Sequence, residues 1–348
     1  MTVSNFAARL LAWHRKHGRH DLPWQHPRTP YRVWLSEIML QQTQVQTVIP
    51  YFENFLRQFP HLPDLAAAPA EAVMKAWAGL GYYSRARNLH KAAQHCMAYH
   101  AGALPDDFDG LLALPGIGRS TAGAILSQAH GSRHAIVDGN VKRVLTRHFA
   151  ITGDAGSSAV DKRLWQLAES LLPETHLADY SQAIMDLGAT VCSSRNPKCT
   201  ACPIAQDCQA LAAGTVLNAP GRKPAKSVPE RETYVVLARC RTGAILLEQR
   251  PDHGIWGGLY SLPEADDSGR AVAIAHRYIT AKKPATVSLP AFKHLFSHFR
   301  LNIHPVLLDG CTAKSHIEDN DRMRWATPDD LSKLGLPAPI QKLLKRLP

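Results

Sequence analysis

A glycine-rich turn between two helical patterns lies at residues 114–119 of this 348-residue chain. Gly116 and Gly118 permit backbone conformations that other residues avoid, so they predict a tight hairpin between helices. The following segment, 120–128, has small and apolar residues at helical spacing, and the free N–H groups of its first turn suit a phosphate. Such turns also join helices in proteins that never meet DNA. We expect a helix-hairpin-helix that grips a nucleic-acid backbone without reading bases.

Asp138 is the single acidic residue between Gly110 and Gly153. On a phosphate-binding surface a carboxylate lowers affinity through charge repulsion. One interpretation is that Asp138 caps a helix beginning near residue 141, although Asn140 could do this without the charge. We favour the other interpretation, a chemical role for Asp138. The basic residues that share this span and suit a phosphate-binding surface are Arg119, Arg133, Lys142, Arg143 and Arg147.

The net charge of +11 points to an anionic polymer as the partner, although basic chains also meet membranes and ribosomes. The length predicts two or three domains. No apolar run is long enough to span a bilayer, so we expect no membrane partner. Residues 1–20 fit an amphipathic helix of the fold and lack the apolar segment of a secretory signal.

Glu37 is the single acidic residue between Leu22 and Phe52. It lies beside an apolar stripe in a helix predicted over residues 31–44. A lone glutamate on a helix is most often a solvated surface residue. Its isolation, and the glutamine-rich segment 41–44 one turn later, make a functional role the more interesting alternative, because glutamine can bind base edges.

The periodicity predicts an all-α region up to about residue 190, followed by an α+β region. The predicted helices of the first region are 5–17, 31–44, 51–59, 69–79, 88–100, 107–114, 120–128, 141–149, 161–172 and 179–191. A linker rich in proline, glycine and basic residues follows at 215–230. The second region has predicted strands at 234–238, 244–247, 285–289, 299–308 and 322–326, and predicted helices at 268–280 and 339–347.

Two further segments have a composition that suits DNA or metal binding. Residues 79–88 combine a glycine turn, two tyrosines and two arginines, which fits base stacking with phosphate contact as well as it fits a core with a basic helix start. Four cysteines fall within 17 residues: Cys192, Cys199, Cys202 and Cys208. Four thiolates in one short loop predict a metal site, and their spacing is compatible with zinc or with an iron–sulfur cluster.

Taken together, six segments resemble the helix-hairpin-helix DNA glycosylases, and most closely the adenine DNA glycosylases of the MutY family. These segments are SEIMLQQTQV, GLGYYSRARNLH, LPGIGRSTAGAI, VDGNVKRVL, MDLGA and the four-cysteine loop, and the resemblance covers the whole chain. That family removes adenine mispaired with 8-oxoguanine or guanine. The resemblance implies a helical catalytic domain at 1–214, a linker at 215–230 and a Nudix-like 8-oxoguanine recognition domain at 231–348. Within the first, it implies a six-helix barrel at about 21–134, and an iron–sulfur domain formed by the N-terminal helix and 135–214.

The resemblance also assigns roles to the two isolated carboxylates. Protonated Glu37 would give a proton to N7 of an adenine flipped out of the duplex, and would then help to activate water. Ionised Asp138 would stabilise the cationic sugar or attack C1′ transiently. Further residues match family positions that contact DNA or adenine. They are Gln42, Thr43 and Tyr82 as wedges, Trp24, Leu40, Val45 and Gln182 in the adenine pocket, and Gly116, Gly118, Ser120 and Asn140 in the hairpin region.

Two sequence features distinguish this chain from related enzymes with other activities. A sister family, endonuclease III, has a lysine after the hairpin that forms a Schiff base with the sugar, whereas this chain has Ser120. We therefore expect a monofunctional glycosylase. The C-terminal domain lacks the Arg-Glu-x-x-Glu-Glu run that holds magnesium in Nudix hydrolases, so we expect a retained fold without hydrolysis.

The resemblance further implies that Phe296, Ser297 and His298 recognise 8-oxoguanine, and that the four cysteines hold one four-iron four-sulfur cluster. The expected partner is double-stranded DNA with A:8-oxoguanine or A:G mispairs, bound by a monomer in the bacterial cytoplasm. Two alternatives stay open: a bifunctional glycosylase and lyase like endonuclease III, and a non-catalytic DNA-binding module with a structural metal.

Overall fold

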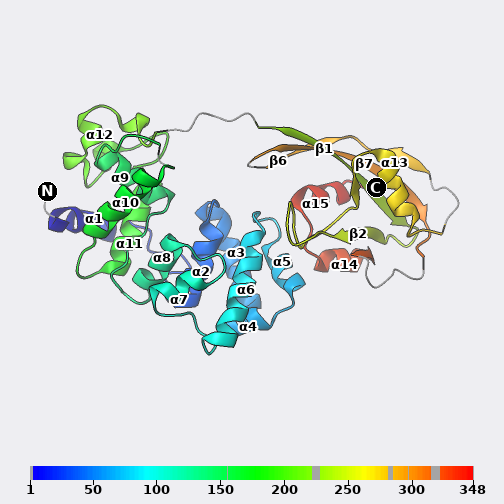
Figure 1. Ribbon diagram of the computed structural model, residues 1–348, viewed down its shortest axis with the longest axis horizontal. Helices are drawn as coiled ribbons and strands as arrows, with labels where there is room; N and C mark the ends of the chain where they lie inside the picture. The colour runs from blue at the N-terminus through cyan, green and yellow to red at the C-terminus, as the bar shows by residue number, and fades with distance from the viewer. Residues whose placement is uncertain are drawn as a thin grey trace. The chain divides into compact units, whose positions relative to one another are not determined.

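The computed structural model describes residues 3–154, 156–221, 228–280, 285–296, 298–314 and 322–347. The chain divides into two compact units (Figure 1). We call Met1–Ala67 with Asn88–Ala225 the helical unit, and Ala68–Arg87 with Lys226–Pro348 the mixed unit. The domain boundaries expected from the sequence stay a prediction.

Helices and short helical turns account for the named elements of the helical unit. They are α1 (Val3–His17), α2 (Pro30–Leu40), α3 (Val45–Gln58), α4 (Leu62–Ala67), α6 (Ser84–Tyr99, which begins in the mixed unit), α7 (Phe108–Ala113), α8 (Arg119–Ala129), α9 (Gly139–His148), α10 (Ser158–Ser170), α11 (Leu177–Asp186) and α12 (Gln209–Ala212). A π-helical turn, Leu187–Val191, continues α11 towards the cysteines. No helix among the described residues is long and apolar enough to cross a membrane.

The first helix packs against helices from the second half of the helical unit. Phe6 and Leu10 of α1 are fully buried in a core that also contains Val144, Leu164 and Ile184, from α9, α10 and α11 respectively. This core includes the residues that flank Asp138, because Val137 and Val141 are buried in it. The packing therefore holds the start of α9 in a fixed position.

The helix predicted over residues 31–44 ends earlier, at Leu40, and the next helix begins earlier than predicted, at Val45. Gln42 has a φ of +60°, a left-handed conformation that interrupts a helix. Helix α3 continues through Pro50, since Val48, Phe52 and Phe55 form a buried stripe whose burial outweighs one lost helical hydrogen bond.

The mixed unit is built on one sheet of eight strands (Figure 1). Its strands are β1 (Glu230–Cys240), β2 (Ile245–Gln249), β3 (Tyr260–Ser261), β4 (Glu264–Ala265), β5 (Thr286–Ser288), β6 (Phe292–Leu295), β7 (Arg300–Cys311) and β8 (Met323–Ala326). The main path runs β3-β2-β1-β7-β5, with β4 paired to β1, β6 to β7 and β8 to β2. The long strands β1 and β7 are parallel, and Val236 lies opposite Val306.

Helices cover and extend this sheet. Helix α13 (Ser268–His276) packs Ala271 and Ala275 against Val236 of β1 and Val306 of β7. The unit also contains α5 (Ala70–Trp77), α14 (Pro328–Lys333) and α15 (Ala338–Leu344). The predicted order, an all-α region followed by an α+β region, is confirmed. The short strands β3, β4 and β6 and the helices α4, α12 and α14 were not predicted.

Candidate active site

Glu37 lies on α2, on the side of the helix that faces α8. Thr29 caps α2 with its side chain, and Pro30 occupies the first turn, where a missing N–H costs nothing. The stripe predicted from the sequence is buried, including Trp34 and Leu35 at 0% exposure. Glu37 itself is half-buried and accepts a hydrogen bond from the side chain of Gln128 on α8.

The environment of Glu37 favours its protonated form. Burial and the negative charge of Asp138 together raise the pKa of Glu37 to about 8, and the Gln128 hydrogen bond partly opposes both effects. An ordinary surface glutamate has a pKa of 4.5. The solvated-surface interpretation of Glu37 is therefore wrong, and the carboxyl group carries a proton at neutral pH.

Asp138 caps α9, as the simpler interpretation of the sequence predicted. The backbone N–H of Val141 donates to its Oδ1 atom at 2.7 Å, and Asn140 Nδ2 donates to Oδ2 at 3.0 Å. Burial raises the pKa of Asp138, while these hydrogen bonds and the charge of Arg143 act in the opposite direction. Capping does not exclude chemistry, because the Asp138 charge also acts on Glu37.

The hairpin brings the start of α8 against the segment that carries Asp138. Gly116 has a φ of +81°, and a Cβ atom there would lie 2.9 Å from Asn88 Cβ, so glycine is required. Ser120 Oγ accepts a hydrogen bond from Val137 N–H at 3.2 Å. One turn later, a Cβ atom at Gly123 would overlap the carbonyl oxygen of Ala135. Gly118 caps α8 without a side chain, which leaves the first turn of α8 without a side-chain acceptor for its N–H groups.

Two arginines of α9 connect this site to the cysteine loop. Arg143 donates to Asn140 Oδ1 at 2.9 Å and to the carbonyl oxygen of Cys192 at 2.7 Å. Arg147 is 2% exposed and donates to the carbonyl oxygens of Ser193 at 2.7 Å and Ser194 at 3.1 Å. The expectation that Arg147 presents its charge to phosphates is therefore wrong, because its guanidinium group binds the cysteine loop from inside the protein.

The other basic residues of the same span form ion pairs at the protein surface. Arg119 pairs with Glu169 at 2.6 Å, and Arg133 Nε lies 3.6 Å from Glu174. Lys142 is paired with Asp161. These partly exposed pairs are weak, so DNA phosphates can compete for the cations.

The four predicted metal ligands line one small pocket. All four cysteines are free thiols and lie partly buried. Burial, together with repulsion by the other three sulfur atoms, raises the pKa of Cys202 to about 11. Four thiols that repel each other's anions in a buried site suit a cationic group placed between them. Among the described residues, no group of three or more His, Cys, Asp or Glu side chains converges on a single metal ion. The donor set, four soft thiolates in one short loop, fits an iron–sulfur cluster by its chemistry.

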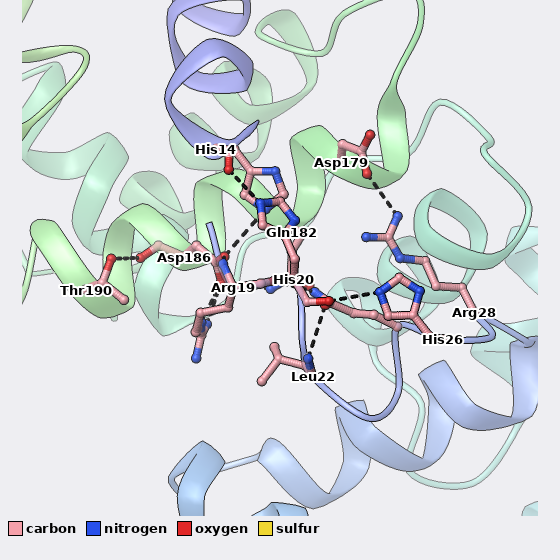
Figure 2. Close-up of polar contacts among 11 residues, drawn as sticks. His14, Arg19, His20, Leu22, His26, Arg28, Asp179, Gln182, Asp186 and Thr190 are labelled. Carbon is pink, nitrogen blue, oxygen red and sulfur yellow. Dashed lines mark hydrogen bonds and ion pairs between the residues drawn. The ribbon is translucent and has the colours of Figure 1, made fainter. Parts of the chain in front are cut away.

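The predicted adenine-pocket residues belong to the helical unit and are at least partly buried. Trp24 is 3% exposed and meets Phe52 edge-to-face at 5.4 Å between ring centroids. Leu40 and Val45 are half-buried and flank the turn between α2 and α3. Gln182 is 2% exposed and donates its side-chain amine to Asp186 (Figure 2).

The predicted wedge residues have unusual backbones. Gln42 and Tyr82 both adopt positive φ values, +60° and +48°, and Tyr82 is 44% exposed. Strained, exposed side chains of this kind cluster at functional sites. Thr43 is half-buried in the same turn as Gln42. Tyr82 belongs to the mixed unit, whereas Gln42 and Thr43 belong to the helical unit.

The predicted 8-oxoguanine segment also lies in the mixed unit. Phe296 stacks on Phe299 with ring centroids 4.6 Å apart, and His298 meets Phe299 edge-to-face at 4.7 Å. Ser297 lies outside the described residues. Sequence reasoning did not identify Gln128, Arg19 or Asp186, since their importance depends on contacts between helices far apart in the chain.

Comparison with known proteins finds relatives that match nearly the whole chain. Residues 35–170 match the family described as HhH-GPD superfamily base excision DNA repair protein, and residues 234–346 match the NUDIX domain. An adenine DNA glycosylase from Buchnera aphidicola subsp. Acyrthosiphon pisum (strain APS) is 36% identical over 99% of this chain and 98% of its own.

Two further relatives extend the comparison. The adenine DNA glycosylase of Homo sapiens is 33% identical over 99% of this chain and 74% of its own. The solved structure of a thermostable thymine-DNA glycosylase is 30% identical, covers 61% of this chain and 97% of its own, and superposes with a TM-score of 0.56. Since the hairpin, the paired carboxyl groups and the Nudix-like sheet all lie within these matches, the chain belongs to the adenine DNA glycosylase family of helix-hairpin-helix base excision repair proteins.

Proposed function

We propose that this chain hydrolyses the N-glycosidic bond of adenine paired with 8-oxoguanine or guanine, and that Glu37 and Asp138 carry the reaction. Family membership makes it an adenine-specific DNA N-glycosylase, a hydrolase of base excision repair. The observation that carries the mechanism is the pKa of Glu37, raised to about 8 by burial and by the neighbouring Asp138 charge. A protonated acid beside an anion is the pair of charges that this bond cleavage requires.

Glu37 supplies the proton. Adenine is a poor leaving group as an anion, so a proton delivered to N7 lowers the barrier to its departure. The base must first leave the duplex stack to meet a carboxyl group on α2. After the bond breaks, the Glu37 carboxylate accepts a proton from the attacking water.

Asp138 supplies the negative charge. The departing base leaves a sugar with positive charge spread over C1′ and the ring oxygen, and a carboxylate stabilises it or bonds to C1′ transiently. Two N–H donors and the charge of Arg143 act to keep Asp138 ionised beside the protonated Glu37. Asn140 thereby acts on the reaction through Asp138.

Ser120 makes the enzyme monofunctional. Its hydroxyl accepts a hydrogen bond from Val137 N–H, one residue before Asp138, so it lies beside the reacting carboxylate. A hydroxyl group cannot form the imine through which a lysine at this position would cleave the strand. We therefore propose base removal without strand cleavage.

DNA binding uses the hairpin and the turn after α2. The uncapped first turn of α8, with Gly116 and Gly118, holds a phosphate. Gln42, Thr43 and Tyr82 enter the duplex near the opposite base, and Trp24, Leu40, Val45 and Gln182 line the pocket for the flipped adenine. Phe296, Ser297 and His298 recognise 8-oxoguanine. The substrate is DNA in the bacterial cytoplasm, and the active species is a monomer.

The four cysteines hold one four-iron four-sulfur cluster. Cys192, Cys199, Cys202 and Cys208 would ligate it through their thiolates, and the cluster would supply a rigid cationic crosslink for the loop. Arg147 binds the loop from the side of α9, so this chain's own contribution is to hold Cys192 and the following residues in place.

The test uses duplexes with one central adenine opposite 8-oxoguanine, guanine or thymine. Products are separated with and without hot alkali, which cuts the strand at a site that has lost its base. We expect the strand to be cut only in the products that were treated with alkali, and only when 8-oxoguanine or guanine lies opposite the adenine. Cleavage without alkali, together with a borohydride-trapped adduct, would support the bifunctional alternative. If Glu37→Gln released adenine as fast as the wild type, the proposed role of Glu37 would be wrong.

A further inference from the structure

The loop before α2 is held against one face of α11 by two ion pairs (Figure 2). Arg19 Nη2 lies 2.7 Å from Asp186 Oδ1, and Arg28 Nη1 lies 3.1 Å from Asp179 Oδ1. Gln182 lies between these two aspartates on α11. Asp179, Gln182 and Asp186 occupy positions i, i+3 and i+7, so they share one face of the helix. The loop and this face of α11 therefore form one polar cluster around Gln182.

Asp186 is the centre of that cluster. Its side chain is 0% exposed and accepts hydrogen bonds from the backbone N–H of Arg19 at 2.7 Å, from Arg19 Nε at 2.8 Å and from Gln182 Nε2 at 2.8 Å. His14 Nε2 lies 3.5 Å from the second oxygen. Burial alone raises the pKa of Asp186, but the contacts with His14 and Arg19 outweigh burial and leave the pKa below its ordinary value. The group is therefore an ionised carboxylate.

An ionised carboxylate accepts hydrogen bonds and donates none. A glutamine side chain that faces it must therefore donate through its amide NH2 group, and its carbonyl oxygen points elsewhere. The oxygen and nitrogen of a free amide exchange places by rotation about the last side-chain bond, so an unconstrained Gln182 offers either a donor or an acceptor. The Asp186 contact removes that choice.

Gln182 lies beside the residues that position the catalytic acid. The adjacent residue, Ser181, donates to Ser127 of α8 at 3.0 Å. Ser127 in turn precedes Gln128, which hydrogen-bonds Glu37. Side-chain contacts thus connect α2 to α8 at Glu37, and α8 to α11 at the residue next to Gln182 in the chain.

We propose that Asp186 is a positioning residue that sets base specificity by fixing the amide orientation of Gln182. This inference rests on the proposed function, in which Gln182 lines the adenine pocket. The fixed amide offers its oxygen to the base, and adenine presents a matching donor, its exocyclic amine at C6. Hypoxanthine carries a carbonyl oxygen at C6, so two acceptors would meet and that base is disfavoured.

The test compares single-turnover release of adenine and of hypoxanthine, each opposite 8-oxoguanine, by the full-length metal-loaded protein. Asp186→Asn replaces the obligatory acceptor with an amide that accepts or donates, so Gln182 can rotate. We expect the adenine-to-hypoxanthine rate ratio to fall by about tenfold, the value of one hydrogen bond matched or mismatched. Asp179→Asn is the matched control, since it weakens the other ion pair on the same helix face and should leave the ratio unchanged.

A double-mutant cycle separates positioning from a general structural effect. Gln182→Leu should lower the ratio by itself, and Asp186→Asn should then lower it no further. If Asp186→Asn slows both bases equally, or if it lowers the ratio again in the Gln182→Leu background, the inference is wrong. Gln182→Leu leaves the Arg19–Asp186 pair intact, so full retention of the ratio in that variant would refute the inference even if Asp186→Asn failed to fold. Failure of the wild type to release adenine at all would instead refute the proposed function.

Discussion

Glu37 holds a proton at neutral pH at the cost of a pH-dependent loss of stability. Its pKa is about 8 in the folded protein and near 4.5 when exposed, so the folded state binds the extra proton between these values. We expect the rate of adenine release to fall by about tenfold per pH unit above pH 8, because the acid form is lost. A pH–rate profile under single-turnover conditions measures this fall.

The same pKa shift predicts how stability changes. The raised pKa stabilises the fold below about pH 4.5, and this contribution is lost as the pH rises through 8. Glu37→Gln removes the titration, so the variant should gain free energy of unfolding relative to the wild type as the pH rises through this window. Glu53→Gln, at an exposed position of α3, is the control and should show no such gain. A constant difference between Glu37→Gln and the wild type across the window would contradict the assignment.

Asp138 performs two functions that can be separated by substitution. Asparagine caps a helix about as well as aspartate, so Asp138→Asn should keep the fold and lose the charge. We expect its rate of adenine release to fall by at least roughly a hundredfold with little change in melting temperature. Asp138→Ala should lose a further stabilisation of about 1 kcal/mol from the cap.

A second capping aspartate provides the control. Asp107 caps α7 and accepts from Gly110 N–H at 2.8 Å, so Asp107→Asn measures the cost of exchanging the cap alone. Its rate of adenine release should equal that of the wild type. Equal rates for Asp138→Asn and the wild type would assign Asp138 to capping only.

At the scale of the elements, most helices could be predicted from the sequence, but the directions of their charged side chains could not. Asp138 and Glu37 could be identified because each is an isolated acid in a basic stretch, a signal that is local. Arg147 could not, because its direction depends on how α9 packs against the cysteine loop, 45 or more residues later. The end of α2 was also missed, since the left-handed Gln42 is a tertiary feature that overrides the helical propensity of Gln41–Gln44.

Arg147 gives α9 a structural role in the cysteine loop. It is buried and binds the carbonyl oxygens of Ala219, Cys192, Ser193 and Ser194, so its removal breaks four hydrogen bonds that hold the cysteine loop and the segment after it. We expect Arg147→Met to lower the free energy of unfolding by about 2–4 kcal/mol. The variant should also lose metal to a chelator faster than the wild type.

The control for Arg147→Met is Arg163→Met, on the neighbouring helix α10, where the side chain is exposed. Thermal unfolding and metal content after gel filtration measure the two effects. If both variants retain metal and stability equally, the contacts of Arg147 with the loop contribute nothing measurable.

At the scale of the whole molecule, the base opposite adenine is proposed to be read in a unit other than the one that holds Glu37. In the mixed unit, Phe296 N–H donates to the carbonyl oxygen of Phe299 at 2.9 Å, which joins the end of β6 to the start of β7. Arg231 lies over the ring of Phe299, 4.6 Å from its centroid. Both contacts involve the buried Phe299, whose ring the exposed His298 side chain meets edge-to-face.

His298→Ala keeps the Phe296–Phe299 hydrogen bond and the Arg231 contact available, and should change recognition of the opposite base. We expect the preference for 8-oxoguanine over guanine opposite adenine to fall by about tenfold, while adenine release opposite guanine keeps its wild-type rate. His276→Ala, at an exposed position of α13 in the same unit, should change neither rate. Single-turnover rates on the two duplexes give the ratio. If His298→Ala slowed both duplexes equally, the segment would contribute to DNA affinity in general, and the opposite base would be read elsewhere in the chain.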